Sequence, residues 1–152
     1  MKTHLKKIYL LLLVTMVLVI PNQLNAQQDL QVGKVFEQYG KKKGVVMVQL
    51  TKEMLQGYNF SMFKSIVIKN NPEAAVFIRQ CIEKDQQEAK KIKQVEQNGE
   101  VTSTILQLAS RGKENRLILY NESPDDKKEL TLIYIESQMD IEEILTTILR
   151  KK

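Results

Sequence analysis

Three stretches of the chain place their apolar residues three and four positions apart, as amphipathic helices do. The first follows Asp29, a typical N-cap residue, and ends near Gly40. The second begins with the Asn-Pro-Glu sequence at 71–73, which combines a cap, a proline at the first helical position and an acid in the first turn. The apolar stripes are Val32, Val35, Phe36 and Tyr39, then Ala74, Phe77, Ile78, Cys81 and Ile82, and finally Ile141, Ile144, Leu145, Ile148 and Leu149.

The last of these helices carries the most complete start signal. Asp140 is the expected cap, and Glu143 three residues later completes an acidic variant of the capping box. Met139 and Ile144 have the spacing of a hydrophobic staple. We therefore expect this helix to be part of the core, and Leu145→Asp to make the protein insoluble.

Other segments are rich in β-branched and aromatic residues and predict strands. Residues 45–50 are largely apolar, which is typical of a buried strand. Residues 130–135 are apolar on both alternating faces, which is typical of a strand in the interior of a sheet. The remaining predicted strands are 65–69, 102–109 and 116–120.

Residues 85–97 fit two interpretations: a solvated continuation of the second helix, or a strand containing Ile92 and Val95. Asn98-Gly99 can end a helix, but it is also the favoured two-residue hairpin turn, so we favour a hairpin. The element order predicts one α+β domain. It has a mainly antiparallel sheet of about five to six strands, packed with two or three helices that include a C-terminal amphipathic helix.

The N-terminus has the order of a secretory signal peptide. Lys2, Lys6 and Lys7 precede an apolar run at 8–20, and Ala26 suits the residue before cleavage. The run is shorter than the roughly 20 residues that span a bilayer. We predict a signal peptide at 1–26 and one domain at 27–152, with no transmembrane segment after cleavage. An uncleaved N-terminal anchor is the alternative.

Charge and composition exclude several function classes. The whole chain carries +5, but removing the lysines of the signal peptide leaves 20 Lys and Arg against 18 Asp and Glu, which argues against nucleic-acid binding. His4 is the only histidine and leaves with the signal peptide, so the mature domain lacks the usual general base. Cys81 lies on an apolar stripe and is expected to pack as a small hydrophobe. We predict no catalytic residue, no metal site and no cofactor.

Three segments carry a resemblance to known proteins. They are Leu-Thr-Leu-Ile-Tyr-Ile-Glu at 130–136 with Asp-Ile-Glu-Glu-Ile-Leu at 140–145, Asn-Arg-Leu-Ile-Leu-Tyr-Asn at 115–121, and the stretch 55–65. They are similar to small exported proteins of Bacteroidota that are grouped in families of unknown function. The resemblance implies a cell-envelope location and a small α+β fold. It implies no catalytic or ligand-binding residue.

One stretch is a candidate contact surface, because aromatic residues and Met are enriched at interfaces. Its residues are Tyr58, Phe60, Met62 and Phe63, which could instead form the edge of the core.

The leading functional prediction is a non-enzymatic interaction module, periplasmic or outer-membrane-associated, with another envelope protein as its partner. One alternative is an enzyme that uses paired carboxylates on a glycan or another small substrate. The other is a membrane-peripheral lipid-binding protein whose last helix exposes its stripe.

Overall fold

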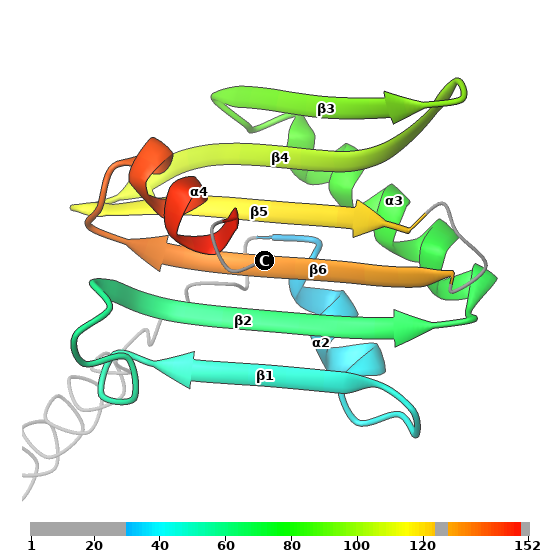
Figure 1. The fold of residues 1–152 in the computed structure, drawn as a ribbon, viewed down its shortest axis with the longest axis horizontal. Helices are drawn as coiled ribbons and strands as arrows, with labels where there is room; N and C mark the ends of the chain where they lie inside the picture. The colour runs from blue at the N-terminus through cyan, green and yellow to red at the C-terminus, as the bar shows by residue number, and fades with distance from the viewer. Residues whose placement is uncertain (1–29, 124–127, 150–152) are drawn as a thin grey trace, which may run out of the picture.

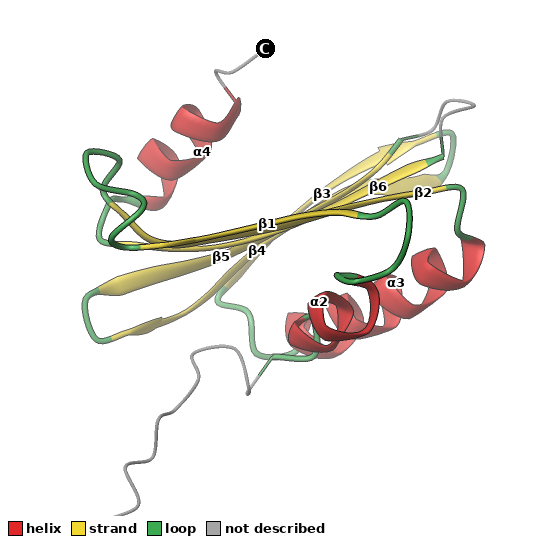
Figure 2. Cartoon of the chain, turned by 90° about the horizontal axis from the view of Figure 1, so that it is seen from below, coloured by secondary structure: helices red, strands yellow, loops and turns green. Residues whose placement is uncertain are grey.

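Six antiparallel strands form the central layer of the molecule, in the order β1-β2-β6-β5-β4-β3 (Figure 1). The computed structural model describes residues 30–123 and 128–149. Helices lie on both faces of the sheet (Figure 2). The order of helices and strands along the chain is the predicted one, and the predicted α+β class is confirmed. The elements are α2 (Gly33–Tyr39), β1 (Val46–Thr51), β2 (Phe60–Lys69), α3 (Pro72–Gln86), β3 (Lys91–Gln97), β4 (Glu100–Arg111), β5 (Glu114–Glu122), β6 (Glu129–Ser137) and α4 (Ile141–Leu149).

Strand β6 lies in the middle of the sheet, as its two apolar faces predict. It pairs with β2 on one side and with β5 on the other. Leu132 and Tyr134 pack into the cluster under α2 and α3, whereas Ile133 and Ile135 pack into the cluster under α4. Alternate side chains of one strand therefore belong to two separate cores.

Strand β1 corrects one prediction. Its apolar sequence indicates a buried strand, but β1 is an edge strand with β2 as its one neighbour, and the Val46 side chain is 60% exposed. Met47 alone among its first three residues points toward a helix-covered face and packs against the larger core. Apolar content therefore indicated a strand here without indicating its position in the sheet.

Strands β4 and β5 each extend two residues beyond their predicted ends on both sides, and two boundaries differ more. Strand β2 begins at Phe60 rather than at residue 65, because residues 60–64 also pair with β6 after a bulge between Phe60 and Met62. The ambiguous stretch 85–97 is divided: α3 ends at Gln86, and β3 then forms the predicted hairpin with β4. At its turn Asn98 and Gly99 have φ angles of 54° and 83°, as a turn with two left-handed residues requires.

The start of α3 and the segment before α2 are held by side-chain caps. Asn71 Oδ1 accepts a hydrogen bond from the Ala74 amide at 2.9 Å, as the cap signal predicts. At the other end of α3, the buried Asp85 carboxylate accepts hydrogen bonds from the amides of Gln31 (2.8 Å) and Val32 (2.9 Å). Asp85 thereby fixes α2 against α3 on one face of the sheet.

Helix α2 also packs closely on the edge strand. A Cβ atom at Gly40 would lie 2.2 Å from the Met47 sulfur, so glycine allows the end of α2 to approach β1. Lys64 Nζ lies 4.8 Å from the centre of the Phe36 ring. Strand β1 is therefore supported from below by α2, although its outer edge is unpaired within the described chain.

Helix α4 covers the opposite face at one end of the sheet (Figure 2). Its first amide donates to Asp140 Oδ1 at 2.8 Å, and Met139 and Ile144 join the same apolar cluster as the staple predicts. Ile144 and Leu145 pack with Leu117 and Ile135 of the sheet. The predicted cap at Asp29 is wrong, because α2 begins at Gly33 and its cap residue is Val32, which makes no side-chain hydrogen bond. Asp29 itself, the signal peptide, residues 124–127, the Leu149 side chain and residues 150–152 lie outside the part described.

Beyond α4, one row of residues runs across the same face of all six strands. The register aligns these residues side by side, and none of them is charged. We call this the open row because α4 lies at the other end of the face (Figure 2). Its members are Val46, Val67, Thr131, Asn121, Ser103 and Val95.

Candidate functional site

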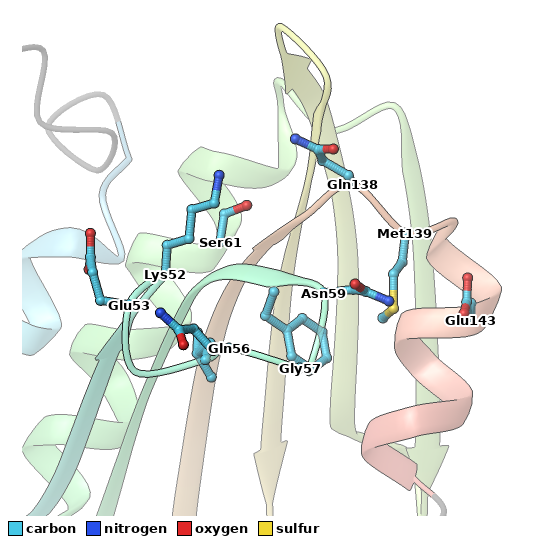
Figure 3. Close-up of a pocket in the computed structure, with 11 residues that line it drawn as sticks. Lys52, Glu53, Gln56, Gly57, Asn59, Ser61, Gln138, Met139 and Glu143 are labelled. Carbon is cyan, nitrogen blue, oxygen red and sulfur yellow. The ribbon is translucent and has the colours of Figure 1, made fainter.

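A polar hollow of about 700 Å³ lies between the loop after β1 and the connection from β6 to α4 (Figure 3). The loop contributes Lys52, Glu53 and Gln56, and the connection contributes Gln138 and Met139. Figure 3 shows these side chains around the opening, with Glu143 on the facing helix. The hollow joins segments that are far apart in the sequence.

The loop takes its shape from two buried anchors and two left-handed residues. Leu55 and Phe60 are buried in the cluster under α4, so the loop folds back onto the sheet. Gly57 has a φ angle of 90°, which favours glycine, and Asn59 has a φ angle of 54°. The Tyr58 amide donates to the Leu55 carbonyl at 3.0 Å. These constraints fix the rim of the hollow.

Hydrogen bonds also tie the floor of the hollow to the neighbouring strands. Glu114 accepts hydrogen bonds from the Ser61 hydroxyl at 2.6 Å and from the Gln138 amide at 3.0 Å. The Ser137 hydroxyl donates to the Asn59 carbonyl at 2.7 Å. The start of β2, the start of β5 and the end of β6 are thus held together under the hollow.

The acid on the loop is not adapted to act as a general acid. The Thr51 hydroxyl donates to Glu53 Oε2 at 2.6 Å, and this hydrogen bond holds the pKa of the Glu53 carboxyl below its usual range. A general acid needs a raised pKa, so that it is still protonated near neutral pH. Glu53 therefore presents a fixed negative charge to the hollow.

A second polar group lies inside the molecule. Arg116 Nε donates to the Tyr134 hydroxyl at 3.0 Å, and this hydroxyl donates to Glu136 Oε1 at 2.5 Å. Burial, and then the hydrogen bond to Glu136, raises the pKa of Tyr134. Because all three residues are buried, we assign this network to the packing of the sheet. Within residues 30–123 and 128–149, no three His, Cys, Asp or Glu residues are grouped as a metal site would need.

The four residues of the predicted contact surface do not share one surface. Phe60 is buried, and Met62 and Phe63 are partly buried against the two different cores. Tyr58 is 56% exposed on the loop. The alternation of a strand separates Met62 from Phe63, so a contact role stays a prediction that now centres on Tyr58.

Sequence reasoning missed the other exposed apolar residues near Tyr58. Eight large apolar side chains of the described residues are exposed, and half of them lie in β1 and the loop after it. Met54 (64% exposed) lies on the same loop as Tyr58. The available signal was a Met beside an acid in a predicted turn, with Leu55 next to it as the residue that is buried. The four are Val46, Val48, Met54 and Tyr58.

Fold and surface define a small α+β protein with a six-stranded antiparallel sheet, an open polar hollow and an apolar edge beside it. A family model described as "Family of unknown function (DUF6108)" matches residues 19–148, and the chain belongs to this family. A search of curated proteins finds no match. None of the helices in the described part of the chain is both long and apolar enough to cross a bilayer.

Proposed function

We propose that this protein is an exported, non-enzymatic component of the cell envelope that acts by binding another protein. Export rests on the lysines and the apolar run of the N-terminus. Binding rests on one observation: Met54 and Tyr58 expose large apolar side chains on the loop after β1, next to an open polar hollow. Apolar residues bordered by polar groups are the usual composition of a protein-binding surface.

We place the partner surface on the loop, with Met54 and Tyr58 as its apolar contacts. Met adapts to irregular surfaces, and Tyr combines a large contact area with a hydroxyl for hydrogen bonding. Leu55 and Phe60 anchor the same loop in the core, which limits the entropy lost when the loop binds. Lys52, Glu53 and Gln56 at the hollow supply polar contacts at the rim.

The two alternative functions have less support. A two-carboxylate enzyme needs a general acid with a raised pKa, and the hydrogen bond from the Thr51 hydroxyl lowers the pKa of Glu53, so Glu53 fits only the ionised member of such a pair. A lipid-binding helix needs its apolar stripe exposed, whereas Ile144 and Leu145 of α4 pack against the sheet. Both observations favour a binding protein that acts through its loop.

Chemical crosslinking in the native envelope, followed by capture of a tagged copy, tests the proposal. We expect Tyr58→Ala to abolish capture of a reproducible partner and to change the free energy of unfolding by less than about 0.5 kcal/mol. Val76→Ala is the matched control, because Val76 is 52% exposed on α3. Equal loss of capture in both variants, or no captured partner, would contradict the proposed function.

A further inference from the structure

We infer that the outer edge of β1 is the interface between two copies of this chain, which pair antiparallel about a two-fold axis through Val48. This goes beyond the proposed function, because it assigns β1 to a second copy and leaves Met54 and Tyr58 to the partner. The paired edges would join the two sheets into one. The inference rests on a contrast between the two edges of the sheet and on the self-complementary sequence of β1.

The two edge strands differ in how they are protected. Exposed edges invite pairing with other chains, and proteins commonly guard them with charged residues, especially lysine. Strand β3 is guarded in this way, since Lys91, Lys93 and Glu96 interrupt its apolar residues. Strand β1 has no charged residue from Val46 to Thr51, although its outer edge lies beside no other element of the described chain (Figure 1).

The sequence of β1 is complementary to itself in the antiparallel direction. An axis through Val48 places Val46 opposite Leu50 of the second copy, and these residues lie on the same face of the sheet as Val48. On the other face Met47 comes opposite Gln49. Apolar residues meet across one face, and no like charges meet, which is the requirement for a stable cross-strand pair.

The charges that flank β1 are complementary in the same register. Lys43 precedes Val48 by five residues, and Glu53 follows it by five, so Lys43 of each copy comes opposite Glu53 of the other, while Lys52 comes opposite the uncharged Gly44. The two-fold axis produces this pairing of opposite charges twice.

The edge is also held in a shape that suits pairing. Helix α2 supports β1 through the close contact of Gly40 with Met47, and β2 pairs with β1 along its length. Such a strand loses little conformational freedom on binding, because its backbone is already extended. Pairing would cover Val46 and Val48, which are 60% and 39% exposed.

Sedimentation equilibrium on protein expressed from the complete sequence gives the first test. We expect twice the mass of one chain at micromolar concentration. Val48→Lys places two positive charges face to face on the axis, and we expect it to raise the dissociation constant at least tenfold. Val95→Lys is the matched control, since Val95 is a 58% exposed valine on the same face at the opposite edge. A monomer at all concentrations, or a dimer equally insensitive to both changes, would overturn the inference.

Disulfide formation tests the register independently. Facing residues in an antiparallel pair have Cα atoms about 4.5–5.5 Å apart, which a disulfide can bridge. We expect Val48→Cys to form a disulfide between two copies on mild oxidation. Val46→Cys is the control, because its two copies would lie about four residues apart along the strands, roughly 13 Å, and could not be bridged. Equal crosslinking of the two variants would overturn this register. The capture experiment depends on Tyr58, so its outcome is separate from both of these.

Discussion

The face of the sheet under α2 and α3 is covered from β1 to β4, whereas the face under α4 is covered at one end (Figure 2). Both faces carry apolar residues from the same strands, so composition alone does not explain the difference. On the covered face, caps at Asn71 and Asp85 position two helices. On the other face, one short helix leaves the uncharged open row without a helix above it among the described residues. The first face therefore carries the larger apolar core, and the second leaves surface for contacts.

The largest effect is expected where α4 closes the second face. Leu145→Asp buries a carboxylate among apolar side chains, which costs several kcal/mol, comparable with the whole stability of a small domain. Helix α4 would then leave the sheet and uncover Leu117 and Ile135, which are fully buried. We expect insoluble protein, measured as soluble yield and as loss of a cooperative melting transition. Thr146→Asp, on the exposed side of α4, should stay folded. Soluble, cooperatively melting Leu145→Asp protein would show that α4 is dispensable.

A smaller effect is expected at Asp85, which holds the segment before α2 against α3 on the covered face. Asp85→Ala leaves the buried amide of Val32 and the part-buried amide of Gln31 without their acceptor, and an unpaired buried donor costs about 1–3 kcal/mol. The Val32 amide alone should therefore lower the free energy of unfolding by about 1–3 kcal/mol in a urea titration, with a smaller addition from Gln31. Asp85→Asn keeps one acceptor oxygen and should lose less. If Asp85→Ala has the same free energy of unfolding as the unmodified protein, the Asp85 hydrogen bonds do not hold α2 in place. The caps would then not explain why this face is covered and the other is open.

The smallest effect concerns thiol reactivity rather than stability. Burial, and then the charge of Asp85, raises the pKa of the Cys81 thiol, so less of the reactive thiolate is present below that pKa. We expect Cys81 in the folded protein to react with a thiol reagent at pH 8 at least tenfold more slowly than in urea. A thiol introduced by Val95→Cys, on the face that α4 leaves open, should react at the rate of an exposed cysteine. Equal rates for the two thiols would mean that the covered face admits the reagent.

Much of the fold could be predicted because local signals and tertiary packing agree. Asn71, the Asn98-Gly99 turn and the two apolar faces of β6 each indicated the element that the structure contains. The position of β1 could not be predicted, because an apolar strand has the same sequence pattern whether it lies inside a sheet or at an edge.

The candidate site was harder to predict than the fold. Tyr58 and Phe60 are near neighbours in the sequence, yet one is exposed and the other is buried, since the left-handed backbone at Asn59 separates their directions. The hollow depends on Gln138 and Glu143, which lie far along the chain from the loop they face. No local pattern contains that contact.

The place of β6 has a consequence for the order of folding. This strand is the last one among the described residues, yet it joins β1 and β2 to the sheet half formed by β3, β4 and β5. Neither half can complete its central pairing until residues 129–137 are available, and pairing β2 with β6 closes a loop of about 60 residues. The topology therefore prevents the two halves of the sheet from joining before β6 is available. A protein built in this way remains open while it is being made, and it becomes compact only when nearly its whole length has emerged.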